Sequence, residues 1–217
     1  MHIVSLNTGR PQLRMRGGRQ YSTAIDRTPA QGPVALSVGG LDGDRVSDER
    51  AHGGPERALC VFASENYAHF EHLLGRALPV PAFGENLTTS GLLEHDVCVG
   101  DEYRVGAARV QVTSPRVPCA KLAGKHGEPL MARWVFESGC CGFYLRVLDT
   151  APLCAGDVIE RLARPRAGWT ITRLLAAFAK TATDEPLWRE IAAIPELSGS
   201  FREFFLRRLG GEPAFGE

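Results

Sequence analysis

The segment TSPRVPCAKLAG, residues 113–124, contains a cysteine whose position is explained better by reactivity than by packing. Cys119 directly follows Pro118 and stands three residues after Arg116, at the end of an alternating stretch that predicts a β-strand. A neighbouring cation favours the thiolate, which is the form of cysteine that attacks electrophiles and binds metals. Arg116 is one candidate cation, and Lys121 is a second. We therefore predict that Cys119 is a functional residue.

A second segment with the composition of a ligand-binding loop is HGGPERAL, which begins at His52. Gly53 and Gly54 allow the backbone to approach a ligand closely, because they carry no side chain. Arg57 can hold an anion through two parallel hydrogen bonds. Taken alone, the segment is also typical of an ordinary surface turn, so both interpretations stay open.

The segment FGENL, residues 83–87, is a third candidate loop. Gly84 permits backbone angles that other residues avoid, and Glu85 and Asn86 offer hydrogen-bond acceptors and a donor. Many loops without a function have this composition, so the segment is ambiguous by itself.

Cys119 is one of six cysteines in the chain. We expect a cytoplasmic protein, in which disulfides are rare, and no C-x-x-C pair occurs. Cys60, Cys98 and Cys154 lie in strand-like runs and are predicted to pack as small apolar side chains. The pair His69 and His72 favours a solvated helix surface over a metal site.

Composition excludes some classes of partner. The chain has 25 basic and 25 acidic residues, and this balance predicts no nucleic-acid partner. The first residues lack the features of a signal peptide. No apolar run approaches the roughly 20 residues of a membrane-spanning helix, so no membrane association is expected.

Several short β-like runs must position these loops. They predict a mainly β domain, a barrel or a sandwich, with strands within residues 1–7, 33–40, 58–64, 96–114, 142–149 and 157–162. Two helices interrupt the pattern, at 65–78 and 128–139. The composition changes after residue 162, where ARPRAG is typical of a linker. Helices at 171–182, 185–194 and 201–210 follow, with Thr170, Asp184 and Ser198 or Ser200 at their starts.

In this order and at these distances, HGGPERAL, FGENLTTSGLLEHDVCVGD and VTSPRVPCAKL resemble the MOSC-domain family (molybdenum cofactor sulfurase C-terminal domain). The closer likeness is to its stand-alone YiiM-like branch, and it covers nearly the whole chain. The resemblance implies a MOSC-type β-barrel with a few peripheral helices over residues 1–163, followed by a small three-helix domain over residues 168–211.

The resemblance also implies a molybdenum cofactor, in which a pterin dithiolene and one protein thiolate hold the metal. The family's ligand cysteine matches Cys119. Arg57, Arg116 and the backbone near Gly53, Gly54 and Gly84 would bind the anionic phosphate of the pterin. The implied cofactor-binding set is His52, Gly53, Gly54, Arg57, Phe83, Gly84, Glu85, Asn86, Leu87, Thr113, Ser114 and Cys119.

The catalytic set implied by the resemblance is Cys119, Arg116 and Arg19. YiiM-like proteins carry a lysine in an early segment that here reads GRQYSTAI, with Arg19 in its place. An arginine keeps the positive charge but stays protonated, so it orients an anion or a hydroxyl and is a poor proton donor.

The reaction implied by the family is reduction of N-hydroxylated compounds such as the purine base 6-hydroxylaminopurine, as a detoxification of base analogues. Each reduction consumes two electrons and two protons and releases water. The chain shows no flavin or iron–sulfur motif, so we expect a separate flavoprotein reductase as electron donor.

Two alternatives use the same residues. Cys119 could carry a persulfide in a sulfur-carrier protein, or it could be a buried residue of a non-catalytic pterin-binding barrel. The role of the helical tail also stays open between shaping the pocket, meeting a partner chain (a homodimer included) and structural support.

Overall fold

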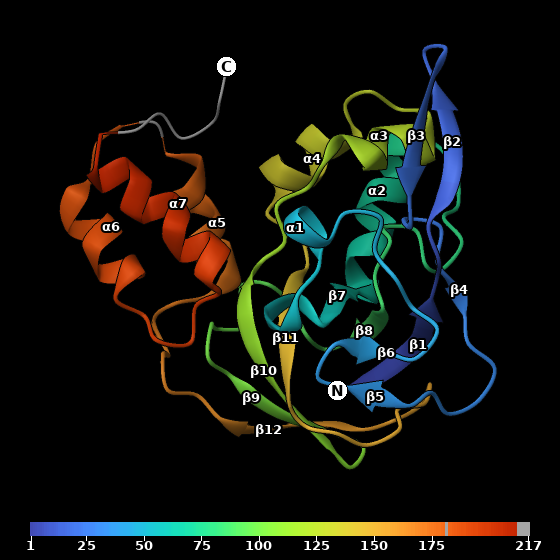
Figure 1. Cartoon of the computed structure of the whole chain (residues 1–217), viewed down its shortest axis with the longest axis horizontal. Helices are drawn as coiled ribbons and strands as arrows, with labels where there is room; N and C mark the ends of the chain where they lie inside the picture. The colour runs from blue at the N-terminus through green and yellow to red at the C-terminus, as the bar shows by residue number, and fades with distance from the viewer. Residues whose placement is uncertain (181, 212–217) are drawn as a thin grey trace.

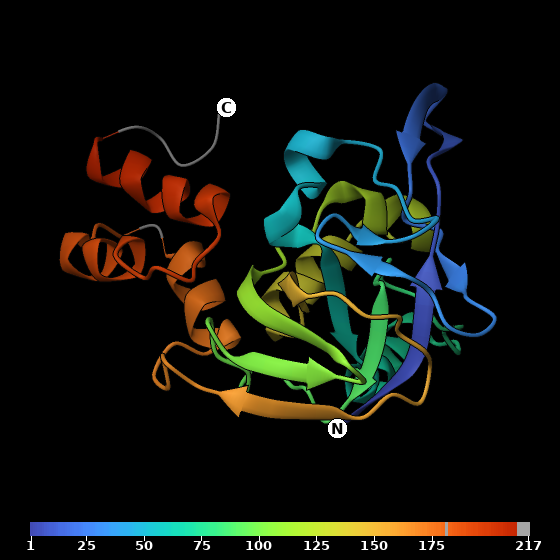
Figure 2. The same cartoon turned by 60° about the horizontal axis from the view of Figure 1, so that its bottom comes forward.

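The computed structural model describes residues 1–180 and 182–211 (Figure 1). A strongly curved sheet forms the main body, with short helices toward one end, and three further helices form a unit beside it. A view turned by 60° shows the same separation of the two parts (Figure 2).

The main sheet has eight strands in the order β12-β9-β10-β11-β7-β8-β1-β4. In that order their bounds are Ile159–Ala163, Glu102–Val105, Ala108–Pro115, Phe143–Asp149, Leu59–Ala63, Leu87–Ser90, His2–Thr8 and Thr28–Pro29. Neighbouring strands are antiparallel except β7 and β8, which are parallel. The sheet is therefore mixed.

The sheet is not detected as the expected barrel, because the strand ladder is open between β12 and β4. One edge of β1 pairs with β8. Its other edge is divided between β4, which pairs at Asn7 and Thr8, and an isolated bridge from His2 to Val158. Since only this bridge and the main-chain hydrogen bonds around it join β1 to the start of β12, the sheet curls without a continuous closing ladder.

Each segment predicted to hold a strand contains one, although 33–40 contains only the two-residue β5 (Leu36–Ser37), paired with β6 (Gly40–Leu41). The sequence analysis missed β4, β8 and a hairpin of β2 (Gln12–Arg16) and β3 (Arg19–Thr23). Gly17 and Gly18 turn this hairpin with φ of 54° and 76°, values that suit a tight two-residue turn. The hairpin projects from the body (Figure 1).

Both helices predicted within the sheet domain are present, as α2 (Tyr67–Leu74) and α4 (Met131–Ser138). His69 and His72 are exposed on α2, as expected. Three helical segments were not predicted, namely α1 (Glu49–His52), the 3-10 turn η1 (Pro55–Arg57) and α3 (Ala120–His126). All three border the segments that the sequence singled out.

Stacked aromatic rings fix the FGENL loop against the sheet. Phe83 is fully buried and stacks on Phe62 of β7, with ring centroids 4.0 Å apart. Tyr67 and Phe70 of α2 pack on the same two rings. Aromatic contacts of this kind add stability beyond area burial, so the loop has a fixed place in the core.

The three tail helices are α5 (Ile171–Ala179), α6 (Glu185–Ala192) and α7 (Gly199–Leu209). As predicted, the side chains of Thr170 and Asp184 cap α5 and α6 by accepting main-chain N–H groups. The predicted first helix ran to residue 182, and its residue 181 lies outside the described residues. The tail has its own apolar core, around residues such as Leu174, Trp188, Ile191 and Phe205.

The linker between the two parts is anchored by its arginines. Arg164 donates two hydrogen bonds of 2.9 and 2.7 Å to the fully buried carboxylate of Asp101. Arg166 forms a similar pair with Glu196, which precedes α7. No described helix combines the length and apolar character that crossing a bilayer requires.

A substitution at Gly142, the residue before β11, tests how tightly this fold is packed. Gly142 has a φ of 75°, and a Cβ there would lie 2.3 Å from the carbonyl oxygen of Val61. We expect Gly142→Ala to lower the free energy of unfolding by about 3 kcal/mol or more, because β7 must move. The control is Gly156→Ala, with φ of 94° and nothing within 4 Å of the added atom, which should cost about 1 kcal/mol. Urea unfolding measures both, and equal losses would contradict the packing argument.

Candidate functional site

A cavity of about 210 Å³ brings the sequence-predicted segments together. It lies at the end of the sheet where β7, β10 and β11 meet the loops before and after them. Eight of the predicted site residues line it, namely His52, Gly53, Gly54, Arg57, Gly84, Asn86, Arg116 and Cys119. The three segments are far apart in sequence, so the fold assembles this site.

Cys119 occupies the N-cap position of α3 with extended backbone angles of φ −120° and ψ 166°. It is half-buried, and it lies just beyond the end of β10. Pro118, immediately before Cys119, restricts the backbone of Val117 to extended conformations. The thiol is therefore held at the boundary between strand and helix, on the cavity wall.

Arg116 is the most deeply buried cation of the site, with 6% of its surface exposed. Its Nη2 donates to the carbonyl oxygen of Phe83 at 2.6 Å, while its buried Nη1 has no hydrogen-bond partner among the described residues. Burial lowers the pKa of this guanidinium, but Cys60, Tyr144 and Cys119 raise it, and the net direction is upward. A buried donor without a partner is costly, so this group is well suited to an anionic or acceptor ligand.

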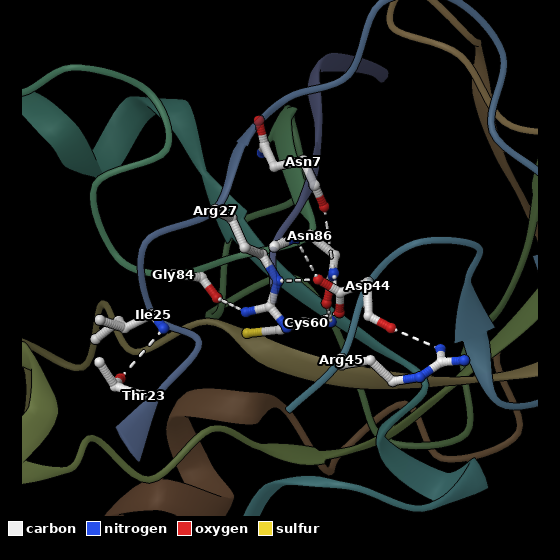
Figure 3. Close-up of polar contacts among 10 residues, drawn as sticks. Asn7, Thr23, Ile25, Arg27, Asp44, Arg45, Cys60, Gly84 and Asn86 are labelled. Carbon is white, nitrogen blue, oxygen red and sulfur yellow. Dashed lines mark hydrogen bonds and ion pairs between the residues drawn. The ribbon is translucent and has the colours of Figure 1, made fainter. Parts of the chain in front are cut away.

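A second arginine, Arg27, also lines the cavity and belongs to a polar network (Figure 3). Its Nε and Nη2 each donate to Asp44 at 2.8 Å, and its Nη1 donates to the carbonyl oxygen of Gly84 at 2.5 Å. Asp44 also accepts from Asn86 Nδ2 at 3.0 Å and from the main-chain N–H of Gly9 at 2.8 Å. This bidentate pair is nearly buried, with side chains 9% and 11% exposed.

Asn86 joins three strands behind this pair. Its Oδ1 accepts from the N–H of Cys60 at 3.1 Å, and its Nδ2 also donates to the carbonyl of Asn7 at 3.3 Å. Its main chain bonds to Asn7 and Cys60 as well. Asn86 thus both lines the cavity and fixes the strands that form it.

Five predicted cofactor-binding residues do not line the cavity. Phe83 and Leu87 are buried in the apolar core. The buried carboxylate of Glu85 accepts from the hydroxyls of Tyr67 and Thr88 and from the N–H of Phe83. Glu85 therefore shapes the FGENL loop from behind, and its oxygens already have donors.

Thr113 and Ser114 are likewise buried, within β10. The hydroxyl of Thr113 lies 2.7 Å from the carbonyl oxygen of Glu56 and 3.1 Å from that of Tyr144. Its own carbonyl accepts from the N–H of Ser198 at the start of α7. These residues support the cavity and do not face it.

Residues 53–57, here called the GGPER loop, contact the helical tail. The Glu56 carboxylate accepts from the N–H of Gly199 at 2.7 Å and from Arg146 at 3.3 Å. Arg57 donates to the hydroxyl of Ser200 and lies over the ring of Tyr144, 5.7 Å from its centroid. The start of α7 therefore positions the loop that carries Gly53 and Gly54.

His52 stays neutral near pH 7 in this environment. Burial and the charges of Lys121, Arg116 and Arg57 lower its pKa to about 4. A neutral imidazole offers one donor and one acceptor to the cavity.

Arg19 does not line the main cavity. It lines a neighbouring hollow together with Tyr21, Ala120 and Lys121. Lys121 borders both spaces, and its Nζ donates to the hydroxyl of Ser47 at 2.7 Å. The predicted catalytic trio is thus divided, with Cys119 and Arg116 in one space and Arg19 in the next.

Several cavity residues were not predicted as site residues, namely Arg27, Asp44, Cys60 and Tyr144, while Lys121 was expected only as a cation near Cys119. Cys60 was expected to pack in a strand; it does so in β7 and also borders the cavity. Cys98 is buried as expected, but Cys154 is only half-buried because it lies in the turn before β12. The continuous apolar run of β7 and the alternating pattern of β11 carried no signal that Cys60 and Tyr144 border a ligand cavity.

All six cysteines are free thiols. Within residues 1–180 and 182–211, no group of three or more His, Cys, Asp and Glu side chains is arranged to hold a metal ion.

Fold and site together define a two-part protein: a curled sheet that carries a cationic, thiol-bearing cavity, and a helical unit that buttresses it. Residues 48–160 match the family model of the MOSC domain, and residues 169–211 match that of the YiiM-like, 3-alpha helix domain. The chain therefore belongs to the MOSC-domain family, in its YiiM-like branch.

Individual relatives support the same family assignment. Protein YiiM of Escherichia coli is 31% identical over 96% of this chain and 93% of its own length. The crystal structure of YiiM from Geobacillus stearothermophilus superposes with a TM-score of 0.81 at 35% identity, covering 96% of this chain and 98% of that one. A protein of Gibberella moniliformis named "Reductase" is 29% identical over 97% of this chain, which corresponds to 38% of that longer protein.

The Arg27–Asp44 pair gives a stability prediction. Asp44→Ala leaves a nearly buried guanidinium without its counter-ion, and we expect it to lower the free energy of unfolding by about 3–5 kcal/mol. Adding Arg27→Met should recover part of that loss, because the unpaired charge is then gone. Glu137→Ala, which breaks the exposed pair with Arg133, is the control and should change little. A double variant less stable than Asp44→Ala would argue for lost packing instead.

His52 gives a pH prediction. Its pKa is about 4 in the folded chain and about 6.5 when unfolded, so between these values only the unfolded state binds the proton. This group therefore makes stability fall as pH drops from 6.5 to 4. We expect His52→Gln to gain stability relative to the wild type over that window, measured as the difference between urea midpoints at pH 7 and pH 4.5. A difference that does not change with pH would contradict a depressed pKa.

Proposed function

We propose that this protein is a molybdenum-cofactor-dependent reductase of N-hydroxylated compounds, with N-hydroxylated purine bases such as 6-hydroxylaminopurine as its substrate class. The observation that carries the proposal is a cavity lined by both Cys119 and the partly unsatisfied Arg116. Two further findings support it: MOSC domains are associated with the molybdenum cofactor, and one relative is named a reductase.

The residues present fit such a cofactor. Cys119 offers a thiol that can bind a metal in its deprotonated form. Arg116 has a buried N–H group without a hydrogen-bond acceptor among the described residues. At Gly54, where φ is 93°, no atom lies within 4 Å of the position that a Cβ would occupy, so the backbone is open on that side. Cys119 would therefore hold the metal, while Arg116, Arg57 and the Gly53–Gly54 backbone would hold the anionic part of the pterin.

When bound, the cofactor supplies the two electrons that convert N–OH to N–H, with two protons taken up and water released. The chain's own groups provide the environment of that reaction. Arg116 and Lys121 place positive charge beside the cavity, where a departing oxygen gains negative charge. Burial raises the pKa of Tyr144 to about 12, so its phenol stays protonated and can donate a hydrogen bond at neutral pH.

Electrons must reach the site from outside in this proposal, and a separate flavoprotein reductase is the proposed donor. The sulfur-carrier and pterin-binder alternatives involve the same Cys119, so the decisive experiment has to separate all three functions.

The experiment compares the wild type with Cys119→Ser, both isolated from a host that makes the cofactor. We expect the wild type to carry about one molybdenum per chain and the variant to lose the metal and the reduction of 6-hydroxylaminopurine, because a serine hydroxyl loses its proton far less readily than a thiol. Elemental analysis and turnover with an added flavoprotein reductase are the measurements.

The control is Cys140→Ser, which changes a half-buried thiol that does not border the cavity. A metal-free wild type with a persulfide on Cys119 would favour the sulfur carrier. A Cys119→Ser variant that keeps pterin and metal would favour the non-catalytic binder.

A further inference from the structure

The hollow beside the main cavity is the strongest feature that the proposed function leaves without a role. It has a volume of about 270 Å³, is more open than the main cavity, and is lined by Arg19, Tyr21, Ala120 and Lys121. Its surface is mainly apolar. Two side chains that carry positive charge thus border an apolar surface.

The β2–β3 hairpin forms one side of this hollow. In its register Arg14 pairs with Tyr21 and Met15 with Gln20, so Arg19 and Tyr21 project from the same face of β3. The opposite face carries Leu13 and Met15, which are 68% and 65% exposed. The apolar residues of the hairpin therefore face solvent, and the face with the aromatic ring and the guanidinium borders the hollow.

Helix α3 forms the other side, immediately after Cys119. The hydroxyl of Tyr21 would lie 2.6 Å from a Cβ on Gly124, so the end of the Tyr21 side chain lies against α3. Lys121 borders both the hollow and the main cavity. A molecule in the hollow thus lies next to the segment that carries the thiol.

We propose that this hollow is the substrate-binding subsite and that it takes a planar aromatic ring bearing an anionic group, so that a nucleoside monophosphate binds better than a free base. This rests on the proposed function and specifies its substrate. The Tyr21 ring provides a face for stacking, and Arg19 provides the planar donor pair that suits a phosphate or carboxylate. Lys121 adds a second charge on the side toward Cys119.

The test uses molybdenum-loaded protein, in which the main cavity is filled, and ligands that cannot be reduced. Binding of adenine, adenosine and adenosine 5′-monophosphate is measured by calorimetry. We expect the monophosphate to bind about tenfold tighter than adenosine, a ratio that corresponds to one charge-assisted contact. Arg19→Gln should remove this preference, while Arg10→Gln, which changes an exposed arginine outside the hollow, should keep it.

The stacking part of the proposal has its own variants. Tyr21→Leu should weaken adenine, adenosine and the monophosphate alike, because the flat ring is lost, whereas Tyr21→Phe should keep their binding. Urea unfolding of each variant shows whether the hairpin is still folded. Equal binding of adenosine and its monophosphate, or equal losses in Arg10→Gln and Arg19→Gln, would overturn the subsite.

Turnover separates this inference from the proposed function. The N-hydroxylated base, its nucleoside and its nucleoside monophosphate are compared, and the expected result is about a tenfold preference in kcat/KM for the monophosphate that Arg19→Gln abolishes. Reduction of all three at equal kcat/KM would overturn the subsite and leave the reductase standing. Absence of any reduction, with the Arg19-dependent binding preference intact, would overturn the reductase and leave the subsite standing.

Discussion

The site depends on two buried guanidinium groups that converge on one short loop. Arg27 donates to the carbonyl oxygen of Gly84, and Arg116 donates to that of Phe83, the residue before it. Gly84 bends this loop away from extended geometry with its φ of 75°, and Glu85 fixes the bend by accepting the N–H of Phe83.

The two arginines differ in what balances their charge. Arg27 has a bidentate carboxylate partner in Asp44, so its charge is compensated within the protein. Arg116 instead donates a hydrogen bond to a neutral carbonyl, and the carboxylate of Glu85 nearby is already engaged by Tyr67, Phe83 and Thr88. Arg27 is therefore a structural support of the wall, whereas Arg116 is available to an incoming anion.

Much of this architecture follows from the sequence, and what does not follow has a physical reason. Short apolar runs such as LCVFA predicted β7, and cap residues such as Thr170 predicted α5, because both signals are local. Whether the sheet closes depends on how the edge of β1 is divided between β4 and the His2–Val158 bridge, which no local pattern encodes. The helix α3 was missed because the two prolines before it, Pro115 and Pro118, suggested a turn, while packing of Leu122 and Ala123 in the interior holds the segment helical.

The same distinction applies to the site. Cys119, Arg116 and the glycine loops could be found because their residue types are unusual for their positions. The sequence suggested Glu85 as a ligand-binding residue. In the structure its carboxylate accepts three hydrogen bonds from within the protein, and it therefore stabilises the FGENL loop from the side away from the cavity. Tyr144 and Cys60 looked like ordinary strand residues, and their paired positions on β11 and β7 place them together at the cavity.

The helical tail belongs to the argument about the cavity as well. The start of α7 holds Glu56 and Arg57, and Thr113 joins the carbonyl of Glu56 to the main sheet. The GGPER loop therefore has contacts on both sides, although its glycines alone would leave it flexible. A ligand that binds the folded loop adds its binding free energy to the stability of the folded chain. Because the loop bridges sheet and tail, that gain extends to the packing of α7, and loading the cavity should strengthen the association of the two parts.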